Sequence, residues 1–176
     1  MIFIFIAGSK SEEVKISLNK EGKREELMVI FAGRGNDVID INLAFIHEAP
    51  ATQGRIIVRG VLRDQSSAKI KGLIRINKGA RESEGFLEQR TLLVGERSKV
   101  ENLPYLEIEN HDVKASHAVT VGAVNQEQMF YLRSRGLSEK EALALLIEGF
   151  LGQAVAGERG NQVGSKLEEV KAYALG

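Results

Sequence analysis

Apolar and polar residues alternate with a period of two along the first third of the chain. The alternation is clearest at 14–18 and at 39–45, where large apolar residues occupy every second position. This pattern predicts strands with one buried face. Residues 1–6 are all apolar. We expect another strand there, because the stretch lacks a basic region before it and is too short for a signal sequence or a membrane span.

Short β-like runs interrupted by glycine continue through the middle of the chain, from 54 to 121. Loosely similar pieces recur at 68–72, 80–85, 98–102 and 112–116, each with a basic residue after a small or acidic opening residue. Weak repeats of this kind favour a solenoid, whose coils bury their inward side chains by stacking on one another. A β-sandwich is the alternative, because its strands recur at similar spacing.

The last third of the chain has a helical pattern. Asn125 is the predicted N-cap of a first helix, which Gly136 is expected to end. Ser138 and Glu141 then form a Ser-x-x-Glu capping box before an apolar run at 142–150. The sequence therefore predicts two helices arranged as a hairpin.

Glycine is frequent from 152 to 164, and this predicts a loop, because glycine disfavours helix interiors. The pattern at 167–175 predicts one last short helix. We therefore expect an all-β core over 1–124 and a helical segment over 125–176. The segment is expected to pack on the core, so that the two form one structural unit.

Composition excludes several classes of function. Lys and Arg number 24, as do Asp and Glu, so no overall field attracts nucleic acid or an anionic membrane. The chain has no Cys, which removes disulfides, a thiolate nucleophile and the ligands of an all-Cys metal site. A cytoplasmic location is expected. The glycines at 33–35 are not followed by a helical pattern or by a Lys-Ser/Thr pair, so a phosphate-binding loop is not expected.

Histidine supplies the candidate metal ligands, because imidazole is the good transition-metal ligand that remains once thiolates are absent. His117 is the main candidate, and His111 is a weaker one. In one straight strand these two residues would lie about 20 Å apart, too far to share an ion unless the chain turns between them. The alternative is that His117 fills a strand position or packs at a protein interface. For His47 we expect a structural role.

Acidic residues near these histidines offer a second kind of site. Glu107, Glu109 and Asp112 lie close together in the sequence, where they could bind a hard cation or act in acid–base chemistry. Solvated surface charge is the simpler interpretation. A metal-dependent enzyme built on His111, His117 and these carboxylates is one alternative for the function.

The segment at 112–150 resembles the C-terminal end of the SufB/SufD family, the scaffold subunits of the SUF iron-sulfur cluster assembly system, and is most similar to SufD. The similarity lies in the residues at 112–114 and 116–117, in Thr-Val-Gly at 120–122, in the heptapeptide FYLRSRG at 130–136 and in Glu-Ala at 141–142. It extends more loosely back to His47. The resemblance implies a core that is a right-handed parallel β-helix. It also implies a short, cysteine-free member without the family's N-terminal helical region.

The resemblance implies a partner for the helical hairpin. In SufB and SufD this segment docks the SufC ABC-type ATPase, and five residues of this chain become candidate contacts: Tyr131, Arg133, Arg135, Ser138 and Glu141. Arginine and tyrosine are also enriched at the energetic centres of interfaces. Phe130, in contrast, is expected to pin the hairpin to the β core.

The resemblance further implies a non-catalytic role in which the chain pairs with itself or with a SufB-like scaffold chain. His117 corresponds to a histidine near the scaffold interface that the family associates with cluster assembly. The sequence reads Ala-Ser-His at 115–117 where SufD-like chains commonly have Cys-Ser-His. No resident cofactor is therefore implied, and an iron-sulfur cluster is expected only transiently or at an interface. A stand-alone structural homodimer is a further alternative.

Overall fold

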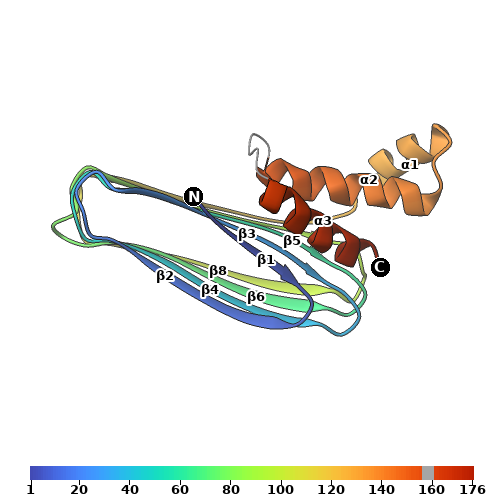
Figure 1. The fold of residues 1–176 in the computed structure, drawn as a ribbon, viewed down its shortest axis with the longest axis horizontal. Coiled ribbons are helices and arrows are strands. Elements are labelled where there is room, and N and C mark those ends of the chain that lie inside the picture. Colours follow the sequence, from blue (N-terminus) through green and yellow to red (C-terminus); the bar gives the residue numbers. More distant parts are fainter. Residues whose placement is uncertain (156–160) are drawn as a thin grey trace.

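The computed structural model describes residues 1–155 and 161–176. Its strands come first and its helices last, as Figure 1 shows. The strands of the described residues are β1 (Ile2–Ala7), β2 (Lys10–Leu18), β3 (Arg24–Gly33), β4 (Val38–His47), β5 (Gln53–Leu62), β6 (Ser67–Ile76), β7 (Ser83–Leu93), β8 (Lys99–Ile108) and β9 (Val113–Ala123). The helices are α1 (Gln126–Ser134), α2 (Glu139–Gly152), a short 3₁₀ helix (Gln153–Val155) and α3 (Asn161–Leu175).

The strands form two parallel sheets, one from the odd-numbered strands and one from the even-numbered strands. Each strand pairs with the strand two places further along the chain. Arg24 lies beside Gln53, Gln53 beside Glu84, and Glu84 beside Lys114. One coil therefore takes two strands and about 30 residues, a usual length for a solenoid repeat. The predicted parallel β-helix is confirmed, and the sandwich alternative is wrong, because the strands of a sandwich pair antiparallel.

Inward side chains of successive coils stack into the core between the two sheets. Leu27, Ile56 and Leu87 occupy one column and are fully buried. Tight packing also depends on glycine in one place. A Cβ atom at Gly60 would lie 1.9 Å from Cζ of Phe31, so only glycine leaves room for that buried ring.

Helices cover one part of the outer face of the odd-numbered sheet (Figure 1). Met28 and Ile30 of β3 point outward and are buried in a second apolar cluster. The cluster also contains Ile147 of α2, and Leu167 and Val170 of α3. The strand pattern therefore leaves an apolar outer surface that the helical segment buries, which favours the packed state through the hydrophobic effect.

The predicted loop at 152–164 is wrong in part. Residues 161–164 belong to α3, which therefore begins six residues before the expected helix at 167–175. Packing of α3 on the sheet outweighs the low helix propensity of Gly164. Residues 156–160 of the predicted loop lie outside the described residues. None of the helices in the described ranges combines the length and the apolar character that crossing a membrane requires.

Candidate partner-binding site

The α1–α2 hairpin projects from one end of the solenoid and is held in shape by its caps. The Asn125 side chain accepts hydrogen bonds from the N–H groups of Glu127 and Gln128, at 2.9 Å and 3.0 Å. Gly136, at φ +98°, adopts the left-handed conformation that ends α1. The predicted N-cap and helix end are both present. The hairpin is therefore a preformed structure with its own local stabilisation.

Ser138 and Glu141 form the predicted capping box at the start of α2. The Ser138 N–H donates to Oε2 of Glu141 at 2.8 Å, and the Glu141 N–H donates to Oγ of Ser138 at 3.3 Å. The hydrogen bonds from Ser138 lower the pKa of the Glu141 carboxyl. Both side chains are thus engaged with each other, where they cap the start of α2.

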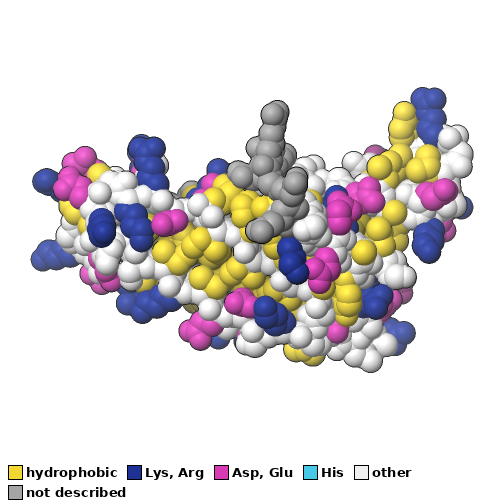
Figure 2. Space-filling view, viewed as in Figure 1, with side chains coloured by type: hydrophobic (Ala, Val, Ile, Leu, Met, Phe, Trp, Pro, Cys, Tyr) yellow, Lys and Arg dark blue, Asp and Glu magenta, His cyan; other side chains and the backbone are white. Residues whose placement is uncertain are grey.

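Aromatic and basic side chains gather at the tip of the hairpin. Figure 2 shows hydrophobic and basic groups together on this projecting end. Phe130 is 75% exposed and Tyr131 is 56% exposed. The prediction that Phe130 pins the hairpin to the β core is therefore wrong, because α1 turns this ring toward solvent. The Arg135 guanidinium lies 5.3 Å from the Tyr131 ring centre, and Arg133 lies 3.7 Å from Glu139.

A hollow runs between α1 and α2 beside this tip. Its volume is about 380 Å³, and its lining is largely apolar. Tyr131 and Leu132 line it from α1, and Leu145 and Leu146 line it from α2. Leu145 is itself well exposed. Glu127 and Gln128 complete the lining. An apolar hollow with an aromatic side chain in its lining has the composition of a protein-binding surface.

The last strand supplies a second candidate surface. Among the described strands, β7 alone pairs with β9, so the backbone groups along the other edge of β9 have no strand beside them. Val119 and Val121 occupy inward positions of this strand and are 41% and 47% exposed. They face the open end of the solenoid. An open edge with apolar side chains favours association with another strand.

Comparison with known proteins finds a family match that includes both the α1–α2 hairpin and β9. The family model described as the SUF system FeS cluster assembly SufBD core domain matches residues 3–150. That match spans most of the solenoid and the whole projecting tip. The chain belongs to the SufBD family.

Two relatives illustrate the match. The chain is 33% identical over 148 residues to iron-sulfur cluster assembly protein SufD of Bacillus subtilis, covering 84% of this chain and 34% of that protein. It is 37% identical over 132 residues to an iron-sulfur cluster assembly SufBD family protein of Mycobacterium tuberculosis, covering 75% of this chain and 16% of that protein. The chain thus spans about a third of the first relative and about a sixth of the second.

In this SufBD core, His117 sits on β9 at an inward position beside Leu87. Leu87 is fully buried, whereas His117 is exposed, because β9 is the last of the described strands. His111 lies instead in the turn before β9. Glu107 forms a hydrogen-bonded ion pair with Arg75, with 2.6 Å between Nε and Oε2. Within residues 1–155 and 161–176, no three His, Cys, Asp or Glu side chains are grouped so that they could hold a metal ion.

His47 is buried at the turn between β4 and β5 of the SufBD core. Its Nδ1 lies 2.8 Å from Oγ1 of Thr52, and Oγ1 of Thr52 lies 2.8 Å from Oγ of Ser83. Burial lowers the pKa of His47 to about 4, so the ring is neutral near pH 7. This histidine ties two successive coils together, which agrees with the structural role expected from the sequence.

Sequence reasoning missed two contributors to the candidate surfaces. Phe130 was placed in the core, although an isolated aromatic residue next to Tyr131 is also typical of an interface. Leu145 lies within the apolar run at 142–150, and the sequence does not distinguish this exposed leucine from the buried apolar residues of α2. The hairpin contacts the solenoid only along its inner part, and the sequence carries no signal for that limit.

Proposed function

We propose that the chain is a non-catalytic scaffold component of cytoplasmic iron-sulfur cluster assembly. The tip of the α1–α2 hairpin docks a SufC-type ABC ATPase, and β9 pairs with a second copy or with a SufB-like scaffold chain. The solenoid (1–124) and the helical segment (125–176) act as one structural unit. The observation that carries the proposal is the exposed Phe130 and Tyr131 on a capped hairpin of a SufBD family chain.

The hairpin fits the ATPase-docking role for energetic reasons. Large aromatic side chains contribute most to binding when they start exposed and become fully desolvated. Phe130 and Tyr131 start exposed, and the caps hold their helix in place before binding, which reduces the entropy lost on association. Arg133 and Arg135 lie at the C-terminal end of the same helix, α1, and supply positive charge at the rim of the proposed interface. ATP hydrolysis belongs to the partner.

The β9 edge fits the scaffold-pairing role. Pairing satisfies the backbone groups along that edge and covers Val119 and Val121. It also places His117 of each chain inside the interface, because His117 shares the inward face of β9 with these valines. A single imidazole per chain is a poor site for a metal by itself. A transient iron-sulfur cluster would require thiolate ligands from a SufB-like partner, because a second copy of this Cys-free chain adds only a second imidazole.

The stand-alone homodimer is the second candidate, because the β9 edge alone supports it. It differs from the scaffold in one respect: a stand-alone homodimer does not bind a partner at the exposed hairpin tip. The metal-dependent enzyme has no comparable support, because Glu107 is paired with Arg75 and His111 lies in a turn. Binding of an ATPase therefore separates the two remaining candidates.

The proposal is tested by anaerobic co-expression with the SufC-type ATPase of the same genome. The purified material is analysed by size-exclusion chromatography with light scattering. We expect a stable complex that is lost in a Phe130→Ala/Tyr131→Ala double variant. Tyr105→Ala is the matched control, because Tyr105 is an exposed tyrosine on β8, away from the hairpin. Absence of a wild-type complex, or equal loss in the control, would contradict the proposal.

A further inference from the structure

The C-terminal end of α3 contacts the loops that connect β1 to β2, β3 to β4 and β5 to β6. These loops lie together at one end of the strands. The Tyr173 hydroxyl donates a hydrogen bond to Oδ2 of Asp37 at 2.8 Å. The Arg34 guanidinium lies 4.4 Å from the centre of the Tyr173 ring. Gly8 leaves room for the phenol, because a Cβ atom there would lie 3.1 Å from the Tyr173 oxygen. Tyr173 is therefore held by the β3–β4 turn and lies close to the β1–β2 turn.

A third turn holds the end of the same helix. Nη1 of Arg63, in the β5–β6 turn, donates to the carbonyl oxygens of Ala174 at 2.9 Å and Leu175 at 2.6 Å. These carbonyls belong to the last turn of α3, which has no intrahelical donors for them. A cation at this end also interacts favourably with the helix dipole. Equivalent turns of three successive coils thus contact one end of α3.

Support passes from α3 to the hairpin through α2. Among the helices, α1 packs against α2, while α2 packs against α3 and β5. Buried Ile147 and Leu151 of α2 share one apolar cluster with Leu167 and Val170 of α3. The helix α3 in turn lies on β1 and β3. The helix α2, which packs against the helix that carries Phe130, is therefore supported by α3.

We infer that α3 is a strut that sets the position of the α1–α2 hairpin, and that Arg63, Asp37 and Tyr173 are positioning residues for partner binding. The attachment is polar and directional, as is required to fix the position of a helix end. The helix lies beyond the residues that match the SufBD core model. The partner-binding half of this inference rests on the proposed function.

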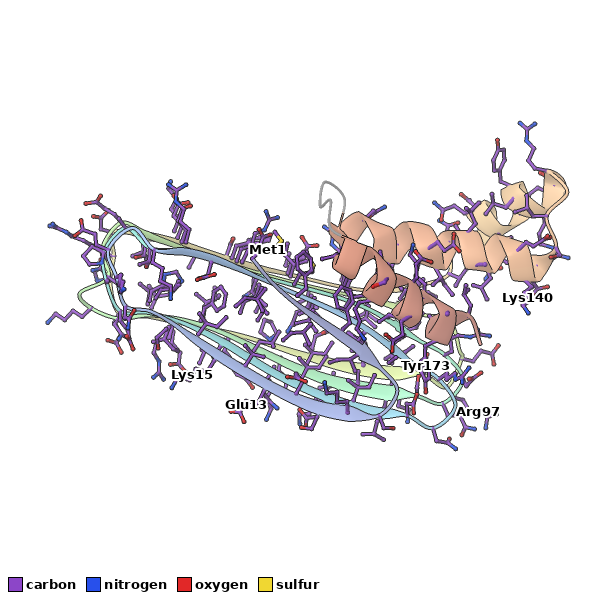
Figure 3. The ribbon with its side chains drawn as sticks, viewed as in Figure 1. Met1, Glu13, Lys15, Arg97, Lys140 and Tyr173 are labelled. Atoms are coloured by element: carbon purple, nitrogen blue, oxygen red, sulfur yellow. The ribbon has the colours of Figure 1, made fainter. Side chains whose placement is uncertain are left out.

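The geometry is tested with spin labels, which suit this protein because the chain has no Cys. Labels at Glu13→Cys on β2 and Lys140→Cys on α2 report the distance between the solenoid and the hairpin by double electron–electron resonance. Both side chains are exposed, and Figure 3 shows them on well-separated parts of the molecule. Labels at Lys20→Cys and Gln65→Cys measure the solenoid itself. The background variants are Tyr173→Phe, Arg63→Ala and, as the control, Tyr105→Phe.

We expect the solenoid–hairpin distance distribution to broaden in Tyr173→Phe and more strongly in Arg63→Ala. The Tyr105→Phe control and the distance within the solenoid should not change. An unchanged solenoid–hairpin distribution in both variants would overturn the strut, whether or not an ATPase binds. In titrations with the SufC-type ATPase, Arg63→Ala should bind about fivefold more weakly, the effect of losing hydrogen bonds worth about 1 kcal/mol. Broadening with unchanged affinity would refute the positioning role while leaving the proposed function intact.

Discussion

His117 lies directly beside Leu87 in the register between β9 and β7. The same column of inward side chains continues back through Ile56 to Leu27. An imidazole therefore takes the place that a core residue occupies in each earlier coil. It remains exposed at the open end, where a second chain can reach it. A polar residue at this position contributes little to the core of its own chain, which agrees with a role at an interface.

Replacing His117 separates function from stability. We expect His117→Ala to change the free energy of unfolding by no more than about 0.5 kcal/mol, because the side chain is exposed. Cluster assembly measured anaerobically with the complete SUF components should fall strongly. His111→Ala is the matched control and should retain assembly. Equal assembly activity of the two variants would show that His117 has no specific role in cluster assembly.

Charge on the inward face of β9 should prevent pairing of the scaffold chains. In Val119→Lys/Val121→Lys, two inward-pointing charges would have to be buried on association, which is unfavourable. We expect light scattering to show monomers for this variant and dimers for the wild type. Val38→Lys is the control, because Val38 is 64% exposed on β4 and distant from the edge. A variant that remains dimeric would place the pairing surface elsewhere.

The contact between Gly60 and Phe31 makes a clear prediction for the core. Gly60→Ala places a methyl group against the buried ring and should destabilise the fold by about 1–3 kcal/mol or more, as overpacking does. Gly122→Ala on β9 meets no atom within 4 Å and should be nearly neutral. Urea unfolding of the two variants measures the difference. Similar midpoints for both would show that the ring is free to move away.

His47 should make the fold sensitive to acid. Its pKa is about 4 in the folded chain and 6.5 in the unfolded chain, so the unfolded state binds the extra proton between these values. Stability is therefore full above pH 6.5 and falls as the pH drops to about 4. The loss amounts to about 3 kcal/mol for a shift of this size. Nitrogen-detected NMR titration should show His47 neutral down to about pH 4, and titration near pH 6.5 would contradict this.

Local patterns in the sequence anticipated the elements of this structure well. The alternation at 39–45 lies within β4, and the Asn125 cap and the Ser138–Glu141 capping box are present as predicted. These features depend on neighbouring residues, which the sequence displays directly. The resemblance in 112–150 supplied the parallel pairing, because alternation alone fits a sandwich equally well.

Contacts between distant residues could not be predicted in the same way. Arg63 reaches carbonyls 111 and 112 residues away, and nothing near either segment signals that contact. The early start of α3 depends on the same docking. The exposure of Phe130 depends on how far the hairpin projects from the solenoid, which is a property of the assembled fold. The local pattern therefore predicts that Phe130 packs on the β core, whereas the structure exposes it beside Tyr131.

We propose that the α1–α2 tip docks an ABC-type ATPase. Hydrogen–deuterium exchange of the chain with and without the SufC-type ATPase tests it most directly, because exchange reports which backbone segments become protected. We predict strong protection in α1 and in the first half of α2, with little change in β2, β4 and β6. Protection confined to the solenoid, or no protection at saturating ATPase, would contradict the account.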